Sequence, residues 1–349
     1  MKVIQALKGS LTTLCIFLTG CGNAMNKNAT EFEWHATDSA PEGYPMEIRQ
    51  GDFHYHDKSG GLYIPAGATL YSGWGEMVSR HVTGQRTKPL PDSVGVYFFS
   101  YTENQFYHGE FDLPYEEILS LFRAGVQERP DRPIYNGIMI GVAPGGAVSV
   151  WLKGFRTKEV FFGQAQKVGI DPSDGFDLPF ESKEESEAYA KQILIDTVTP
   201  EQLASLKKNG IPFGTWARYR KLYKWAPTYK EGKNSTDKEM VAKFLNGEWH
   251  MMPTILTDEV ANTPRPLPRH LEFSVDVGDE SLFYIITFEE FELMEAFEKL
   301  GAHGEKVYIE FDAQAPRQNM KIRVYNDTAP KDAKTPKEHI ELKKFHVKP

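Results

Sequence analysis

Both cysteines of this 349-residue chain, Cys15 and Cys21, lie within its first 21 residues. The rest of the chain has no thiol, so neither a disulfide nor a thiolate-bound metal can hold its fold together. Burial alone must do so. Hydrophobic residues make up 40% of the chain and aromatic residues 13%, which is enough for two domains of ordinary size to bury a core each.

The first 20 residues have the pattern of a bacterial export signal. Lys2 and Lys8 accompany an apolar run, Leu11–Leu18, that is too short to span a bilayer. The run ends in Leu-Thr-Gly-Cys, which resembles the lipobox of bacterial lipoproteins, in which the cysteine receives a diacylglycerol and, after cleavage, an N-acyl chain such as palmitate. We therefore predict a signal peptide over 1–20 and lipidation of Cys21; the alternative is an ordinary signal peptide that happens to contain a cysteine.

Several acyl chains on one cysteine make a lasting membrane anchor, whereas a single chain binds only marginally. Gly22 follows the cysteine, in place of the Asp that resembles an inner-membrane retention signal. We expect an outer-membrane lipoprotein that faces the periplasm, the inner membrane being the less favoured site. The formal charge is −8 and includes Lys2 and Lys8, which leave with the signal; such an acidic chain is a poor binder of nucleic acid.

Aromatic and β-branched runs punctuated by Gly and Pro predict strands and turns between residues 46 and 150. Val94–Ser100 and Phe106–Phe111 are expected to form one hairpin, and Ile138–Leu152 a second one that turns at Pro144-Gly145-Gly146. Between them, the apolar spacing of Tyr115, Ile118, Leu119 and Phe122 predicts a helix that has Pro114 in its first turn and Gly125 at its end.

Capping-box spacings predict further helices. Ser182 with Glu185 and Thr199 with Gln202 indicate two helices between 182 and 210. Thr236 with Glu239 predicts a third helix, which Asn246-Gly247 would stop. The polar segment Lys230–Ser235 before it is the predicted domain boundary.

A repeat follows that boundary. Leu90–Phe111 superposes on Leu267–Phe288 without a gap, and both copies share Leu-Pro, a Glu, Phe-Tyr and a final Phe. After the second copy, a Thr287/Glu290 capping box predicts a helix that ends at Gly301, followed by strands over Val307–Phe311 and Met320–Tyr325.

These patterns predict an α+β fold of two related modules, each made of antiparallel β-hairpins with a packed helix, the first elaborated by extra helices. The expected organisation is a signal peptide (1–20), a lipidated flexible tether (21–33), a first α+β domain (34–232), a second, smaller α+β module (236–330) and an extended tail (331–349).

Motifs for enzyme chemistry are weak. His54 and His56 on one strand face could share a cation, but two such histidines are more often an exposed polar face, and no third ligand is near. Gly141–Gly146 is not followed by a helix as a phosphate loop requires, so a hairpin turn explains it better. We therefore predict no catalytic, cofactor-binding or metal residues, no cofactor other than the lipid, and no enzyme activity.

Two segments are candidates for binding a partner. Thr215–Tyr229 interleaves aromatic and basic residues, which suits phosphate, glycan or a protein hot spot, although inward rings with snorkelling cations would be the commoner arrangement. Asp276–Glu298 holds eight carboxylates and no Lys or Arg, which is either a solvated helix face or a surface for a basic partner. The candidate partner-binding residues are Trp216, Arg218, Tyr219, Arg220, Tyr223, Trp225, Asp279, Glu280, Glu289 and Glu292.

Three stretches, Leu90–Phe122, Gly141–Trp151 and Tyr219–Trp225, resemble a family of Gram-negative lipoproteins catalogued as domain of unknown function 2931. The resemblance covers about residues 40–230, and its most specific pieces are Ser-Tyr-Thr-Glu-Asn-Gln-Phe-Tyr and Ala-Pro-Gly-Gly. It carries no catalytic residues. It implies a periplasmic immunity lipoprotein that binds and neutralises a type VI secretion phospholipase-like toxin; the alternatives are a structural or glycan-binding envelope lipoprotein and a hydrolase using His54 and His56 with a metal.

Overall fold

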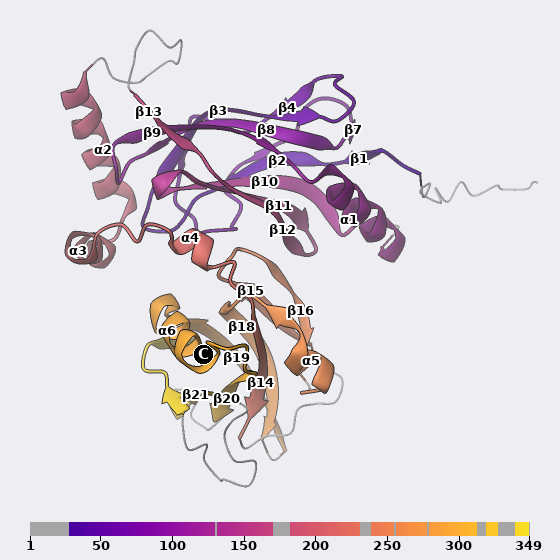
Figure 1. The fold of residues 1–349 in the computed structure, drawn as a ribbon, viewed down its shortest axis with the longest axis vertical. Coiled ribbons are helices and arrows are strands. Elements are labelled where there is room, and N and C mark those ends of the chain that lie inside the picture. The colour runs from indigo at the N-terminus through magenta and orange to yellow at the C-terminus, as the bar shows by residue number, and fades with distance from the viewer. Residues whose placement is uncertain are drawn as a thin grey trace, which may run out of the picture.

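The computed structural model describes residues 28–129, 131–169, 182–230, 239–254, 256–277, 279–312, 319–326 and 339–348. It is a mixed α+β protein with several antiparallel sheets, as predicted. Figure 1 shows two halves that meet near α4, the upper one holding β1–β13 and the lower one β14 onward. In the described ranges no helix combines the length and apolarity needed to cross a membrane. Cys21 and the predicted signal peptide lie outside the described residues.

The N-terminal half contains a two-stranded sheet (β1-β7), two larger sheets and the helices α1, α2 and α3. Its six-stranded sheet has the order β13-β9-β8-β3-β4, with β5 paired to β3, and its second sheet contributes β12-β11-β10-β2-β6 to a longer ten-stranded path. The elements are β1 (Glu31–Glu33), β2 (His35–Ser39), β3 (Met46–Tyr55), β4 (Gly61–Tyr63), β5 (Thr69–Leu70), β6 (Arg80–His81), β7 (Thr87–Pro89), β8 (Pro91–Ser100), β9 (Gln105–Asp112), α1 (Tyr115–Glu128), β10 (Tyr135–Ala143), β11 (Ala147–Gly154), β12 (Thr157–Gln164), β13 (Gln166–Val168), α2 (Lys183–Thr197) and α3 (Pro200–Asn209).

The C-terminal half also consists of two sheets. One is five-stranded, β17-β14-β20-β21-β22, and the other contributes β23-β19-β18-β15-β16 to the ten-stranded path. The elements are α4 (Thr215–Arg218), β14 (Tyr223–Tyr229), β15 (Glu239–Phe244), β16 (Trp249–Pro253), α5 (Asp258–Asn262), β17 (Pro264–Arg265), β18 (Pro268–Val277), β19 (Glu280–Phe288), α6 (Glu290–Leu300), β20 (Val307–Asp312), β21 (Lys321–Asn326), β22 (His339–Glu341) and β23 (Phe345–Lys348).

The predicted hairpins are present. β8 pairs with β9 through Val94↔Phe111, and β10 pairs with β11 through Ile138↔Leu152. The second hairpin turns at Pro144–Gly146, a 3-10 turn in which Gly145 has φ 78°, a left-handed value that suits glycine. Helix α1 buries Ile118, Leu119 and Phe122 as expected.

Gly125 does not end α1, which continues to Glu128. A Cβ at position 125 would lie 3.0 Å from Cβ of Ile134. The glycine is therefore needed for the close approach of the following chain and is not a helix stop.

The helix predicted after Thr236 is wrong. Thr236 lies outside the described residues, and Glu239–Phe244 is strand β15. Its buried residues, Met240, Ala242 and Phe244, alternate with less buried ones, which is the period of a strand and not of a helix. Asn246-Gly247 forms the turn between β15 and β16, where Gly247 has φ 84°.

Two helix caps at 182–210 are confirmed, and one farther on is corrected. The Ser182 side chain accepts from the Glu185 N–H, and Thr199 with Gln202 forms a full capping box. In α6 the N-cap is Glu289 and not Thr287. Thr287 belongs to β19, where its hydroxyl lies 3.0 Å from Nδ1 of His270.

The predicted boundary at 232–236 separates two strands of the same half, because β14 pairs in parallel with β20 and β15 pairs with β18. Ordered structure also begins inside the predicted tether, since Glu31–Glu33 pairs with β7. Inside the predicted tail, β22 pairs with β21 and β23 pairs with β19.

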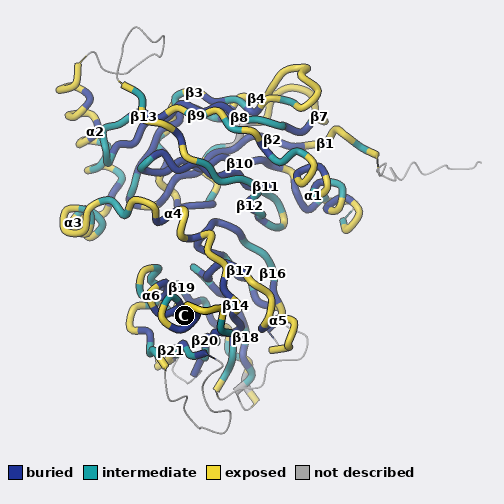
Figure 2. Tube along the Cα trace, viewed as in Figure 1, coloured by how far each residue is buried: buried dark blue, intermediate teal, exposed yellow. Residues whose placement is uncertain are grey.

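The β10–β11 hairpin contributes to the core of each half, because it is buried on both faces. Val148, Val150 and Leu152 belong to the core of the N-terminal half, whereas Met139 and Trp151 join the core of the C-terminal half. Figure 2 shows the buried strands inside each half and the exposed helices α3 and α5 at the periphery. A buried strand pair with two apolar faces explains the nearly continuous apolar sequence of 138–152.

Candidate functional site

The ten-stranded sheet is joined across the two halves by a single residue pair, Thr157 of β12 and Trp249 of β16. Beyond that pair the two strands have no further pairing in the described part of the chain. A cleft of about 680 Å³ opens there, between Lys158 and Glu159 on one side and His250–Pro253 on the other. Clefts of this size between structural units are common sites for ligands.

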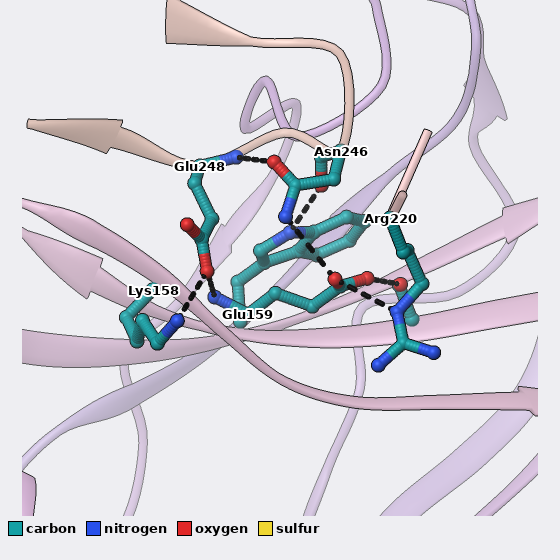
Figure 3. Close-up of polar contacts among 7 residues, drawn as sticks. Lys158, Glu159, Arg220, Asn246 and Glu248 are labelled. Carbon is teal, nitrogen blue, oxygen red and sulfur yellow. Dashed lines mark hydrogen bonds and ion pairs between the residues drawn. The ribbon is translucent and has the colours of Figure 1, made fainter. Parts of the chain in front are cut away.

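Glu159 forms the centre of a polar network on the floor of the cleft (Figure 3). The residue is 9% exposed, and its carboxylate accepts hydrogen bonds from the hydroxyl of Ser149, from Nε of Arg220 at 3.0 Å and from Nδ2 of Asn246 at 3.2 Å. Burial raises the pKa of the Glu159 carboxyl, while these donors and the charge of Arg220 oppose that rise. The network thus offsets part of the effect of burial and favours the charged form of Glu159.

Glu248 links the same network to the edge of β12. Its Oε1 accepts from Nζ of Lys158 at 2.7 Å and from the backbone N–H of Glu159 at 3.1 Å. Asn246 connects Trp151 to the network, because the backbone carbonyl oxygen of Asn246 accepts from Nε1 of Trp151 at 2.9 Å. These bonds join residues of β11 and β12 to the β15–β16 turn, so they fix the angle at which the halves meet.

The far wall of the cleft presents an open strand edge. The N–H of Phe244 donates to the carbonyl of Glu248 at 2.8 Å, so Glu248 and the alternate residues after it turn their backbone groups toward β15. Met251 therefore turns its N–H and C=O to the opposite side, where the structure shows no paired strand beyond Trp249 within the described ranges.

The lining of that wall is apolar and adaptable. Met251, Met252, Pro253 and Val260 line the cleft, together with Leu222, which is 57% exposed. Methionine side chains adjust to differently shaped partners. His250, also in the wall, stacks on Phe244 with ring centroids 4.8 Å apart, and burial lowers its pKa.

The aromatic members of the predicted binding segment lie in the core. Trp216, Tyr219, Tyr223 and Trp225 are between 0% and 6% exposed, and Nε1 of Trp225 donates to the carbonyl of Pro266 at 2.9 Å. The inward-facing arrangement is the one found, because this segment forms α4 and then β14, the strand paired to β20. The rings of Tyr223 and Trp225 therefore cannot form an exposed hot spot.

The basic members of the segment stay near the surface. Arg220 lines the cleft, whereas Nη2 of Arg218 pairs with Glu298 at 2.8 Å. Of the acidic candidates, Asp279 is exposed, and the Glu280 side chain lies outside the described residues. Glu289 caps α6, and the Glu292 carboxylate accepts from the N–H groups of Lys343 and Lys344.

His54 and His56 are not brought together. Nδ1 of His56 lies 3.2 Å from Oδ2 of Asp92, and its ring stacks on Tyr115, whereas His54 lines a separate hollow with Asp52, His108 and Glu110. Among the residues that the structure describes, no group of three or more His, Cys, Asp or Glu side chains is placed to hold a metal ion.

Sequence reasoning missed Glu159, Asn246 and Glu248, the three residues that organise the cleft. One signal was available for Asn246 and Glu248. The dipeptide Asn-Gly after the alternating run 239–244 is a hairpin signature, in contrast to the helix stop predicted above. The sequence around Glu159 does not indicate burial, since three of its partners, Arg220, Asn246 and Glu248, lie 61 to 89 residues away and only Ser149 is near, ten residues before it.

The family described as a protein of unknown function, DUF2931, matches residues 22–214. No curated protein and no solved structure matches the chain. The matched residues end before β14, so they include Lys158 and Glu159 on one side of the cleft but not the opposite wall.

Proposed function

This chain belongs to DUF2931, and we propose that it is a non-enzymatic envelope lipoprotein that binds a partner protein through the cleft between its halves. The partner that the family resemblance implies is a type VI secretion phospholipase-like toxin, which the lipoprotein would neutralise in the periplasm. The observation that carries the binding role is the open edge of β16 beside the Met-rich wall of the cleft.

An open strand edge recognises an extended segment of another protein by adding it as a further strand. Backbone hydrogen bonds from Met251 would align the segment, and side-chain contacts with Met252 and Leu222 would select it. Arg220 donates to Glu159 through Nε, and its guanidinium carries further N–H donors that could reach a carboxylate of the incoming segment.

Met251→Pro tests this mode of binding. Proline removes the N–H that faces the open side and leaves the pairing of β16 with β15 intact, since edge positions tolerate proline. We expect co-purification with the product of the adjacent gene to fall at least about tenfold, a loss of about 1.4 kcal/mol, with less survival of cells that make that product in their periplasm.

Met251→Leu is the matched control, because it keeps the N–H and changes only the side chain. It should retain the partner. Equal retention by Met251→Pro would exclude strand addition at β16, and absence of any complex with the unaltered protein, together with absence of protection, would overturn the immunity role itself.

The anchoring part of the proposal rests on Cys21. With the thiol replaced in Cys21→Ser, no thioether to lipid can form, so we expect incorporation of labelled palmitate to be lost completely and the protein to leave the membrane fraction. Cys15→Ser is the control and should be labelled normally. Equal labelling of Cys21→Ser would refute the lipoprotein and outer-membrane assignments.

We also propose that the two halves are related modules. In each, a meander of three strands (β3-β8-β9 and β15-β18-β19) leads into a helix and a hairpin (β10-β11 and β20-β21). In each, the first hairpin strand pairs in parallel with an early strand of the same half, β10 with β2 and β20 with β14. This recurrence supports the duplication suggested by the Leu90–Phe111 and Leu267–Phe288 segments.

The glycan-binding alternative loses its main support. It was based on exposed rings at 215–229, and Trp225 is fully buried. Loss of glycan binding in Trp225→Ala would therefore report unfolding and not a lost contact.

A further inference from the structure

Two half-exposed cations line the cleft at β16, and each is held by a buried carboxylate. Nε of Arg220 donates to Glu159 at 3.0 Å, and Nζ of Lys158 donates to Glu248 at 2.7 Å. The carboxylate side chains are 5% and 7% exposed, whereas those of Arg220 and Lys158 are 44% and 45% exposed. Both cations are thus open to solvent at the lining of the cleft.

Arg220 uses only one of its hydrogen-bonding groups on Glu159. The bond is made through Nε, and neither Nη group has a partner in the part of the chain that the structure describes. Figure 3 shows both Nη atoms pointing away from Glu159. The guanidinium carbon lies 5.0 Å from the ring centroid of Phe162, so the ring and Glu159 together restrain the group. An arginine restrained in this way presents a preformed fork to a carboxylate.

The bond to Glu159 does not prevent Arg220 from binding a second carboxylate. Arg323 shows such an arrangement in this chain, because its Nη1 lies 2.9 Å from Glu310 and its Nη2 lies 3.5 Å from Asp312. A guanidinium has five N–H donors, so different ones can serve each partner. Arg220 can therefore keep Glu159 and accept an incoming carboxylate at the same time.

The cations of the cleft are not balanced by exposed carboxylates. Glu259 is the one exposed carboxylate among the described lining residues. A third lining cation, Arg265, is 9% exposed and donates to two backbone carbonyls at 2.7 and 2.8 Å. Those acceptors are uncharged, and Arg265 forms no ion pair within the described ranges.

The positive charge extends to the opposite wall, at His250. Burial lowers the pKa of His250, and the charge of Glu248 raises it. Three cations lower it further: Arg265, Lys158 and Arg156. Positive charges thus outnumber negative ones around a residue that lines the cleft beside the open edge of β16.

We propose that the segment bound in this cleft is acidic, with carboxylate side chains that pair with Arg220 and Lys158. The inference rests on the proposed strand addition at β16 and names the chemistry of the partner. A segment in the cleft lies between β16 and the two cations. Two cations favour acidic side chains over a single chain terminus, and complementary charge speeds association and rejects other partners.

Fluorescence anisotropy with the full-length protein in a maltoside detergent tests the charge preference. The probes are fluorescein-labelled, amidated peptides, Glu-Val-Glu-Val-Glu-Val and Gln-Val-Gln-Val-Gln-Val. We expect the Glu peptide to bind saturably and at least about tenfold more tightly than the Gln peptide at low salt. The difference should shrink as NaCl is added, because salt screens exposed charges.

The double variant Glu159→Gln with Arg220→Gln removes the exposed cation together with the carboxylate that holds it. No buried charge is left unpaired, and the net charge is unchanged. It should bind the Glu peptide at least about tenfold more weakly and bind the Gln peptide as before. Lys158→Gln, which removes the other cation, should also weaken binding of the Glu peptide.

Arg218→Gln with Glu298→Gln is the matched control. The Arg218 side chain is 47% exposed, pairs with Glu298 at 2.8 Å and is not part of the lining, so this variant should bind both peptides normally. Circular dichroism verifies that each variant is folded. Absence of saturable binding, equal binding of the Gln peptide, or unchanged binding of the Glu peptide by folded variants lacking Arg220 or Lys158 would each overturn the proposal.

Two further arms separate this proposal from its alternatives. If the two peptides bind alike and Met251→Pro abolishes the binding of both, segments add to β16 without selection by charge. If Met251→Pro leaves binding of the Glu peptide unchanged, the acidic preference holds and strand addition fails. Equally tight binding of a fluorescein-labelled oligothymidylate would reveal a general anion surface and overturn the assignment to a peptide.

Discussion

Trp151→Ala is expected to lower the free energy of unfolding by about 3–5 kcal/mol. The indole is fully buried, packs edge to face on Trp74 with centroids 4.9 Å apart, and donates to the carbonyl of Asn246. Alanine would leave a large cavity where the β10–β11 hairpin meets the C-terminal core, and would leave a buried carbonyl without its donor. Denaturation in urea, followed by circular dichroism, measures the loss.

Two further variants test the role of Trp151. Trp151→Phe retains a buried ring and removes only the N–H, so it should lose less than Trp151→Ala. Trp249→Ala removes an indole that is only partly buried, on strand β16 of the other half, and should also lose less. If Trp249→Ala were as destabilising as Trp151→Ala, Trp151 would not be the main contact between the halves.

Gly75→Ala should be the most damaging single-methyl substitution at the junction. A Cβ at this position would lie 2.4 Å from Cα and 2.6 Å from the carbonyl oxygen of Gly247. Both neighbours are backbone atoms of the turn that carries Asn246, so neither can rotate away. We expect a loss of roughly 3 kcal/mol beyond the strain of the left-handed backbone, measured as the shift of the urea midpoint.

Gly67→Ala provides the matched control for that backbone strain. Gly67 has the same φ of +81° as Gly75, and a Cβ there would meet nothing within 4 Å. It should lose only the strain, about 1–2 kcal/mol. Similar losses in the two variants would show that the halves can separate at this contact without cost.

The candidate site could not be predicted because it depends on contacts between the two halves, whereas the features that were predicted are local. Local features were predicted correctly: the hairpins at 94–111 and 138–152 and the caps at Ser182 and Thr199. Each of them depends on residues that are close together in the sequence. The predictions for Thr236 and Thr287 failed, because there the strand pairing of β15 and β19 overrode local capping patterns.

The aromatic segment at 215–229 shows the same division. Its composition allowed both buried rings, the commoner arrangement, and a binding surface, and the parallel pairing of β14 with β20, about 80 residues later, decided for burial. Local chemistry sets which side chains can serve as core, but the partner strand sets which face turns inward.

By itself, the sequence determined an α+β chain without cysteine beyond residue 21, its hairpins and most of its helix starts, along with a pattern over residues 1–21 that predicts export and lipidation. Tertiary structure alone decided that Glu159 is buried and that β12 and β16 diverge to open a cleft. The physical reason is distance along the chain: a local pattern encodes the period of an element, whereas a cleft between two halves depends on which elements meet.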